Sequence, residues 1–164
     1  MKKLGIIGGG QLGSMLCQAA KKLDFQTIIL TNDSDAPAQN FCDEFLCSNY
    51  TAKDNLEKFA KTCDIITFEF ENIPFETLND LSAIKPVFPD PNINKIVQNR
   101  LLEKNYVNEL GVKTTKYAHI KNKKDLIKNS SLLPGFIKTT TLGYDGKGQL
   151  FLENINNLKI KEID

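Results

Sequence analysis

The chain has 164 residues, of which 41% are hydrophobic and 25% charged, the ordinary range of globular proteins. This length accommodates one domain, or one small domain and part of another. The net charge of +1 gives no indication of a nucleic-acid partner. No apolar run approaches the roughly 18 residues of a membrane span, and no signal peptide follows Met1. We therefore expect a cytoplasmic protein that acts on small molecules, without a membrane partner.

The distribution of charge and the cysteine content indicate which ligands the chain could bind. Residues 1–94 hold 8 lysines and 13 acidic residues, a net charge of −5, whereas residues 95–164 hold 13 basic and 7 acidic residues, a net charge of +6. A basic second part suits a polyphosphate ligand, although a solvated lysine-rich face explains it equally well. The four cysteines show no C-x-x-C spacing and His119 is the single histidine, so we expect reduced thiols and no zinc site.

The first forty residues predict a β-α-β unit. Residues 4–7 read as an apolar strand, residues 8–13 contain three glycines with G-x-G-x-x-G spacing, and residues 27–30 read as a second strand. Helical spacing between the strands predicts a face that packs on a sheet. Its members are Leu12, Met15, Leu16, Ala19, Ala20 and Leu23. With Asp33 about 20 residues after the glycines, an NAD(P)-binding oxidoreductase domain is one open alternative.

The rest of the first part continues this α/β alternation. We expect a loop at 36–38, strands at 45–47, 64–68 and 86–89, and helices at 54–61 and 75–84. The strand before Glu69 would deliver Glu69 and Glu71 to its carboxyl end, where open α/β sheets bind ligands. Alternation along an extended chain gives the two carboxylates opposite faces and different roles. One of them could instead be solvated and the other cap the helix near Pro74.

The chain is expected to change domain near a proline-rich linker. Residues 89–91 should be extended, because residues before proline avoid the helical region, and we place one domain over 1–94 and a second over 95–164. The second domain begins with a predicted helix at 93–110 that contains Arg100, the only arginine, and ends at Gly111. The elements expected after it are a strand at 114–120, a helix at 123–129, strands at 134–138 and 150–152, and a helical start at 154–158.

A glycine-rich loop, residues 139–149, separates the last two strands. Its three glycines permit positive φ and the close approach of an anion, and successive N–H groups in such a turn form an anion-binding concavity. Lys138 and Lys147 bracket the loop with positive charge. It is not a P-loop, which needs G-x-x-x-x-G-K-[ST] before a helix. A plain hairpin turn is the alternative.

Three motifs, in this order, resemble the 5-(carboxyamino)imidazole ribonucleotide synthase family of purine biosynthesis. They are Gly8-Gly9-Gly10-Gln11-Leu12-Gly13, Phe68-Glu69-Phe70-Glu71-Asn72-Ile73-Pro74 and Gly143-Tyr144-Asp145-Gly146-Lys147-Gly148-Gln149. The resemblance implies a Rossmann-like pre-ATP-grasp domain with a parallel sheet, followed by the start of an ATP-grasp domain, its α+β small lobe. It also implies a ligase that uses ATP, Mg²⁺ and bicarbonate to carboxylate 5-aminoimidazole ribonucleotide.

The resemblance also assigns roles to the matching residues. Gln11, Leu12 and Glu69 would position the ribonucleotide, with Glu69 at its ribose hydroxyls and Tyr144 facing it. Asp145 would orient or deprotonate the amine, and Lys147 would steady the carboxyphosphate. The residues expected to hold ATP are Arg100, Lys138, Gly143, Tyr144, Asp145, Gly146, Lys147, Gly148 and Gln149. Tyr144 and Asp145 could instead only shape the turn.

The chain departs from the family pattern at Ser14, where arginine is usual, and more mildly at Asn99 and Lys147. No acidic cluster after residue 100 suits Mg²⁺, so we expect no metal site in this chain and metal ligands beyond residue 164. We thus expect the N-terminal part of an enzyme, inactive alone, whose full-length form would be a homodimer. A second open alternative is a non-catalytic remnant that binds ribonucleotide or a partner chain.

Overall fold

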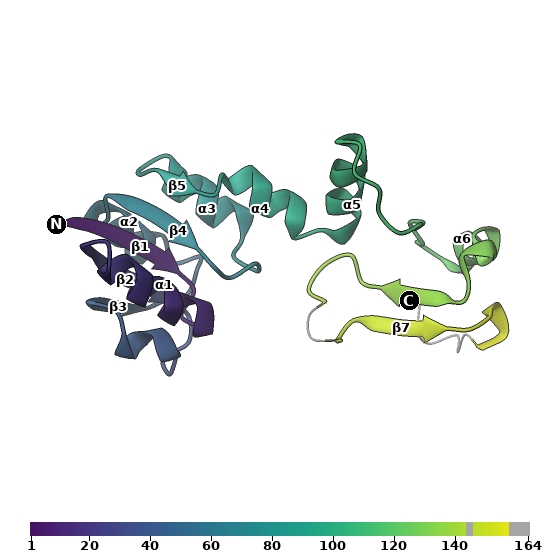
Figure 1. Ribbon diagram of the computed structural model, residues 1–164, viewed down its shortest axis with the longest axis horizontal. Helices are drawn as coiled ribbons and strands as arrows, with labels where there is room; N and C mark the ends of the chain where they lie inside the picture. The colour runs from purple at the N-terminus through teal and green to yellow at the C-terminus, as the bar shows by residue number, and fades with distance from the viewer. Residues whose placement is uncertain (144–145, 158–164) are drawn as a thin grey trace. The chain divides into compact units, whose positions relative to one another are not determined.

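The computed structural model describes residues 1–143 and 146–157. The chain divides into two compact units, Met1–Lys95 and Ile96–Asp164. The first unit contains a five-stranded sheet and the second a two-stranded sheet (Figure 1). None of the helices within the described ranges has the length and apolar character that crossing a bilayer requires.

The sheet of the first unit is parallel throughout, which confirms the predicted α/β class. Its strands are β1 (Lys2–Ile7), β2 (Phe25–Thr31), β3 (Glu44–Cys47), β4 (Ile65–Phe68) and β5 (Val87–Phe88). They lie in the order β3-β2-β1-β4-β5. The strand order reverses between β1 and β4, and in open α/β sheets ligands bind outside the carboxyl ends of the strands at such a switch point.

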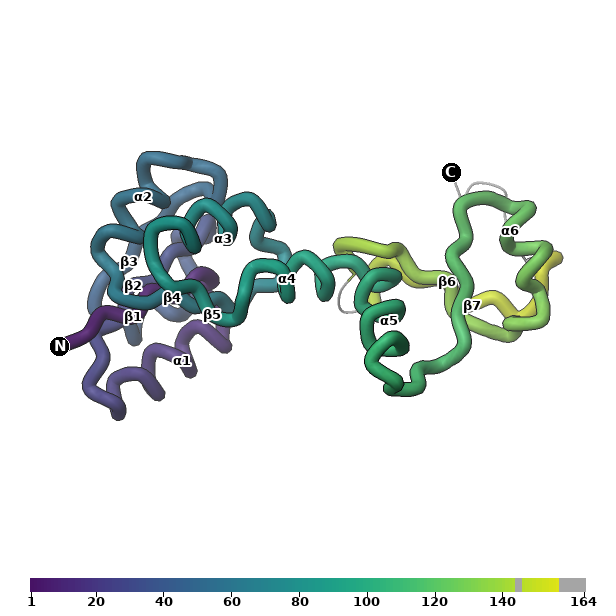
Figure 2. Tube along the Cα trace, turned by 90° about the horizontal axis from the view of Figure 1, so that it is seen from above, coloured from purple at the N-terminus to yellow at the C-terminus, as the bar shows by residue number. Residues whose placement is uncertain are grey.

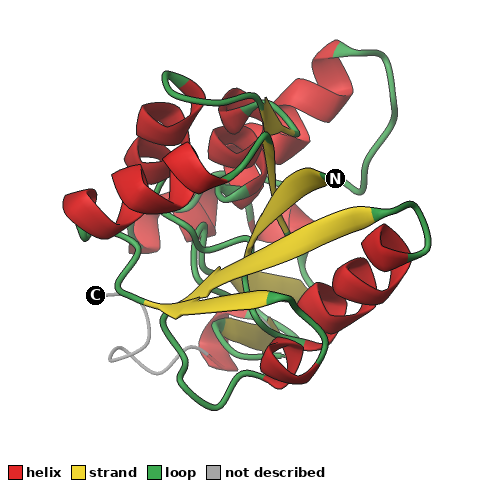
Figure 3. Ribbon diagram, turned by 90° about the vertical axis from the view of Figure 1, so that its left-hand side faces the viewer, coloured by secondary structure: helices red, strands yellow, loops and turns green. Residues whose placement is uncertain are grey.

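Helices cover both faces of this sheet (Figures 2 and 3). Helix α1 (Gln11–Lys21) and the 3-10 helix η1 (Pro37–Asn40) pack on one face, and α2 (Lys53–Thr62) and α3 (Phe75–Ser82) pack on the other. Consecutive residues of β1 pack into the cores on opposite faces of the sheet: Ile6 packs with Cys17 of α1, whereas Ile7 packs with Phe59 of α2. This double burial explains the continuous apolar runs of β1 and β2.

The predicted inward face of α1 is only partly right, because Ala20 is buried and Leu16 packs against the core, whereas the other predicted members are exposed. The buried residues of α1 are small ones: Gly13, Ser14, Cys17 and Ala20. Leu12, Met15 and Leu23 are instead 57%, 56% and 71% exposed. The cause is close packing, because a Cβ on Gly13 would lie 2.6 Å from the Gly8 carbonyl oxygen. A helix this near the turn presents its smallest side chains to the sheet. In α2, by contrast, the predicted inward residues are buried: Leu56, Phe59 and Ala60.

The predicted extended linker at residues 89–91 is only partly right, because Pro89 and Asp90 lie outside helices and strands whereas Pro91 is helical. Helix α4 (Pro91–Val97) begins at Pro91, whose fixed φ suits a first helical turn. Asn94 of this helix is 2% exposed, and its Nδ2 donates a hydrogen bond to the Ile73 carbonyl oxygen at 3.3 Å. The two units divide between Lys95 and Ile96, so the chain passes from one to the other within a helix.

The single helix predicted over residues 93–110 is two helices, α4 and α5 (Arg100–Glu109). Asn99 between them has extended backbone angles, and its side chain accepts hydrogen bonds from the Leu101 and Leu102 amides. This N-cap ends one helix and starts the next. Helix α5 ends as predicted at Gly111, where the Gly111 and Val112 amides bond the Asn108 and Val107 carbonyls in a Schellman motif.

The remainder of the second unit surrounds an antiparallel hairpin. It contains α6 (Lys123–Lys128), the 3-10 helix η2 (Ser130–Leu132), β6 (Gly135–Lys138), β7 (Gln149–Leu152) and the 3-10 helix η3 (Ile155–Asn157). β6 and β7 pair through Phe136 and Phe151, whose ring centroids lie 5.1 Å apart. The strand predicted at 114–120 has no regular structure. Its side chains bond to α5 instead, for example Thr114 to Asn108.

Candidate functional site

The first candidate site is the turn between β1 and α1, which wraps around the carboxylate of Glu69. The Gly8 amide donates to the Leu30 carbonyl at 2.9 Å, and the Glu69 amide donates to the Ile7 carbonyl at 3.0 Å. These bonds hold the ends of β1, β2 and β4 side by side. The Gly10 amide then donates to Oε1 of Glu69 at 3.0 Å. A half-buried carboxylate therefore lies at the start of α1.

Glycine is required where this turn touches Glu69. Gly8 has φ +111°, a backbone conformation that residues with a side chain rarely adopt, and a Cβ there would lie 2.7 Å from Oε1 of Glu69. A Cβ on Gly10 would lie 3.3 Å from the same oxygen, a less severe approach. No acidic residue occupies the first turn of α1 and Gly10 has no side chain to cap it. Glu69 thus supplies the negative charge that a helix N-terminus favours.

The other residues predicted for this site lie on the first turn of α1. Gln11 and Leu12 are both exposed there. Ser14, which stands where the family has arginine, is only 6% exposed, and its hydroxyl donates to the Gly10 carbonyl at 3.1 Å. This side chain is consequently committed to its own helix.

Asp33, the acid of the dinucleotide fingerprint, lies in the turn after β2. Its Oδ1 accepts a hydrogen bond from the Asp35 amide at 2.9 Å, which forms a local turn. In a dinucleotide site the pyrophosphate binds at the N-terminus of the first helix. Here that position already holds the Glu69 carboxylate, which would repel a second anion.

The second candidate site is the loop that joins β6 to β7. The Thr139 amide donates to the Gly148 carbonyl at 2.8 Å, directly beyond the last pair of the ladder. Gly148 has φ +68°, and a Cβ there would lie 2.6 Å from Oγ1 of Thr139. Gly146 also has positive φ, at +79°. Two glycines of the predicted anion loop therefore adopt conformations that favour glycine.

Basic residues lie along this loop as predicted. Lys138 and Lys147 are both exposed, as is Gln149. Nζ of Lys138 lies 5.9 Å from the ring centroid of Phe136 on the same strand. The backbone amide of half-buried Arg100 donates to the Thr140 carbonyl at 2.8 Å, so the start of α5 contacts the loop. Tyr144 and Asp145, which were assigned to ATP and substrate, lie outside the described residues.

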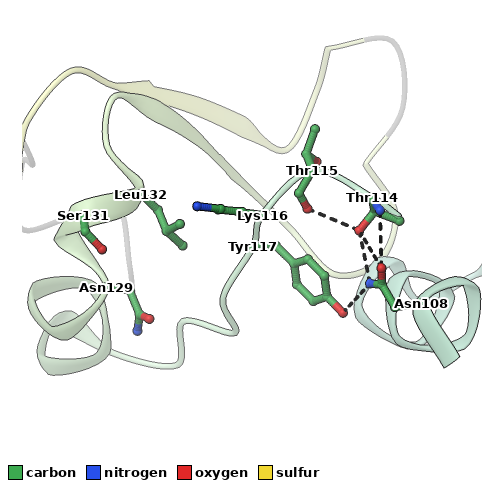
Figure 4. A pocket seen from close by; sticks show the side chains of 8 residues that line it. All are labelled: Asn108, Thr114, Thr115, Lys116, Tyr117, Asn129, Ser131 and Leu132. Atoms are coloured by element: carbon green, nitrogen blue, oxygen red, sulfur yellow. Dashed lines mark hydrogen bonds between the residues drawn. The ribbon is translucent and has the colours of Figure 1, made fainter. Parts of the chain in front are cut away.

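A third feature is a polar hollow of about 400 Å³ in the second unit, which sequence reasoning missed (Figure 4). Asn108 of α5 lines it and donates to Oγ1 of Thr114 at 3.1 Å and to the Tyr117 hydroxyl at 3.2 Å. Asn129 and Ser131 line it from the segment that follows α6. No sequence motif marks this hollow, because its residues come from three separate segments.

Among residues 1–143 and 146–157, no three His, Cys, Asp or Glu side chains are grouped closely enough to hold a metal ion. All four cysteines are free thiols. Burial raises the pKa of Cys63 to about 12, and a Cβ on neighbouring Gly5 would lie 2.5 Å from its sulfur. Cys63 is therefore a packing residue and not a nucleophile. His119 is exposed.

Comparison with known proteins identifies the class. Residues 1–98 match the family described as the ribonucleotide synthetase preATP-grasp domain, and the chain belongs to this family. The matched region contains both the glycine turn and Glu69.

Particular relatives within that class are N5-carboxyaminoimidazole ribonucleotide synthases, which confirms the resemblance seen in the sequence motifs. The protein of that name from Pseudomonas aeruginosa is 39% identical over 152 residues, covering 92% of this chain and 42% of its own length. The one from Brucella melitensis is 37% identical over 155 residues, covering 93% and 43%. The chain thus spans about two fifths of the length of these relatives.

Solved structures agree with this assignment. The crystal structure of N5-carboxyaminoimidazole synthetase from Staphylococcus aureus, a complex with ADP, matches with a TM-score of 0.88 and 34% identity. The match covers 93% of this chain and 42% of that one. The likeness therefore extends through both units and is not limited to the Rossmann-like part.

Proposed function

We propose that this chain forms the ribonucleotide-binding and part of the ATP-binding portion of an ATP-dependent ligase that carboxylates 5-aminoimidazole ribonucleotide. Residues 1–94 are the pre-ATP-grasp domain and residues 95–164 begin the ATP-grasp domain. In the reaction, ATP phosphorylates bicarbonate to carboxyphosphate, and the amine of the ribonucleotide then captures the carboxyl group. The observation that carries the proposal is the Glu69 carboxylate enclosed by the glycine turn.

The chemistry of Glu69 supports a ribose and argues against a dinucleotide. A carboxylate accepts several hydrogen bonds, so Glu69 can hold the Gly10 amide and still accept from ribose hydroxyls. The same negative charge disfavours a pyrophosphate at the start of α1. Gln11 and Leu12 on that first turn are exposed and would contact the base or sugar. The oxidoreductase alternative is therefore the weaker one.

The second unit would hold the triphosphate. Lys138, Arg100 and the loop glycines Gly143, Gly146 and Gly148 supply cationic side chains and close main-chain approach. Lys147 and Gln149 continue this surface, and Lys147 would steady carboxyphosphate. Tyr144 and Asp145 are proposed to face the ribonucleotide, with Asp145 orienting or deprotonating the amine.

The metal, the cellular location and the oligomeric state complete the proposal. Mg²⁺ would neutralise the ATP phosphates during phosphoryl transfer, and we place its ligands beyond residue 164. Four free thiols support a cytoplasmic location, because disulfides are rare there. A homodimer of the full-length enzyme is also part of the proposal.

Calorimetric titration of the 164-residue chain with 5-aminoimidazole ribonucleotide tests the ribose role of Glu69. Glu69→Gln should weaken binding about tenfold or more, since hydrogen bonds to charged groups are among the strongest. Glutamine still has an oxygen to accept the Gly10 amide, so the turn should persist. Glu76→Gln on the exposed surface of α3 is the matched control and should bind like the wild type.

Two results would contradict the proposal. Tight binding of NAD⁺ without any response to the ribonucleotide would favour a dehydrogenase. Bicarbonate-dependent ADP release by residues 1–164 alone would show that the metal site is within this chain after all.

A further inference from the structure

The break between α4 and α5 links Arg100 to the glycine loop. Asn99 has φ −117° and ψ 108°, and its side chain accepts from the Leu101 amide at 3.0 Å and the Leu102 amide at 3.2 Å. The Glu103 amide donates to the Asn99 carbonyl at 2.9 Å, which is the first bond of α5. Asn99 is therefore a complete N-cap in both side chain and backbone.

This cap gives the Arg100 amide a partner outside its helix. In a continuous helix, the amide of residue 100 would donate to the carbonyl of residue 96. After the break it donates instead to the Thr140 carbonyl at 2.8 Å. The first residue of α5 is thus fixed to the loop residue two positions after Lys138.

The loop end of this link is itself fixed to the hairpin. Thr139 donates its amide to the Gly148 carbonyl at 2.8 Å, and its Oγ1 lies where Gly148 has no room for a Cβ. A chain of hydrogen bonds and contacts therefore runs from Asn99 through Arg100, Thr140 and Thr139 to Gly148. It links the start of α5, where Arg100 lies, to both ends of the loop that follows Lys138.

Beyond its N-terminus, α5 is held by side-chain hydrogen bonds to residues 114–117, such as Asn108 to Thr114 and Lys104 to Thr115, and not by a buried core. None of its residues is buried within the described part of the chain. A helix without core contacts depends more on its cap and on the few bonds that tie it to neighbours. The Asn99 cap and the Arg100–Thr140 bond consequently have more influence on where Arg100 lies than they would in a buried helix.

We propose that Asn99 is a positioning residue for ATP: by interrupting the helix it releases the Arg100 amide to hold Thr140, and so fixes Arg100 relative to Lys138 and to Thr139, Thr140 and Gly148. This rests on the proposed function, in which these groups bind the triphosphate. Asn99 itself does not touch the nucleotide in this assignment. Aspartate, which offers the same acceptor geometry at an N-cap, should substitute for it.

The experiment combines hydrogen exchange with ATP binding on the whole 164-residue chain. In Asn99→Ala, the Arg100 and Thr139 amides should exchange about fivefold faster by NMR, the factor that corresponds to loss of a typical N-cap, and the dissociation constant for ATP should rise about fivefold. Asn99→Asp should restore both values. Asn122→Ala is the matched control, because Asn122 caps α6 in the same way, accepting from the Asp125 amide at 3.1 Å.

Each outcome decides the matter. Unchanged exchange at Arg100 in Asn99→Ala overturns the inference while leaving the proposed function intact, and so does faster exchange with unchanged ATP affinity. An equal loss of ATP affinity in Asn122→Ala also overturns it, because any lost cap would then suffice. A wild-type chain that binds no ATP contradicts the assignment of the triphosphate to the second unit, on which this inference rests. If Asn99→Ala fails to fold, Asn99→Asp decides the question. An ATP affinity equal to that of the wild type supports the inference, and a lower affinity overturns it.

Discussion

At the scale of single residues, Gly13 has little room for a side chain on the face of α1 that meets the turn after β1. A Cβ there would meet the Gly8 carbonyl oxygen at 2.6 Å, and the carbonyl belongs to backbone that also touches Glu69. We expect Gly13→Ala to lower the free energy of unfolding by about 1–3 kcal/mol, as overpacking does. Urea denaturation followed by circular dichroism measures this.

Gly10→Ala is the matched comparison for Gly13→Ala. Its Cβ would lie 3.3 Å from a side-chain oxygen of Glu69, and its φ is −73°. The loss of a favoured N-cap residue and the smaller entropy of the unfolded chain oppose one another, so the net change should stay within about 1 kcal/mol. Equal losses in the two variants would contradict the close approach of α1 to Gly8.

The residues of the first site were only partly predictable. The sequence placed Glu69 at the end of a strand and the glycines in a turn, because apolar runs and glycine spacing are local signals. That the Glu69 carboxylate meets the Gly10 amide depends on the register of β1 and β4, in which Ile7 lies beside Phe68. Register is a long-range property, so no local pattern contains it.

At the scale of elements, the errors have a common physical cause. Periodicity predicted α2 and α3 well, since each buries one apolar stripe. It failed at Asn99, because the apolar spacing that predicted one helix over residues 93–110 continues across the N-cap that separates α4 from α5. It also failed at residues 114–120, where a strand-like pattern has no neighbouring strand to pair with. In α1 the residues that face the sheet are small, because the helix packs too close to it for large side chains. Contacts that periodicity does not encode decide each case: a local side-chain cap at Asn99, and tertiary packing in α1 and at residues 114–120.

Helix α4 gives a prediction at the same scale. Asn94→Ala removes the hydrogen bond that the buried Asn94 side chain donates to the Ile73 carbonyl, which should cost about 0.5–1.5 kcal/mol of the first unit's stability. Asn92→Ala on the same helix is the control, because Asn92 is exposed and bonds only its neighbour Asp90. Chemical denaturation of both variants should separate them; similar stabilities would show that α4 is not anchored through Asn94.

At the scale of the whole molecule, the two units differ in how much core they possess. The first contains two clusters of buried apolar side chains, one on each face of its sheet. In the described part of the second unit, the buried hydrophobic residues are Leu126 and Leu152. Stability follows buried apolar surface, so the second unit should open locally at a lower free energy than the first.

Limited trypsin digestion read by mass spectrometry measures this difference. We expect the first cleavages at Lys113, Lys116 or Lys121, in the segment without regular structure, well before any cleavage within residues 1–85. Leu152→Ala should speed cleavage of the second unit several-fold and leave the first unchanged, because Leu152 is 1% exposed and its truncation leaves a cavity. ATP should slow the same cleavages if it binds the folded second unit, because a ligand stabilises the state it binds. Early cuts at the exposed lysines of α2 would instead show that the first unit is the less stable one.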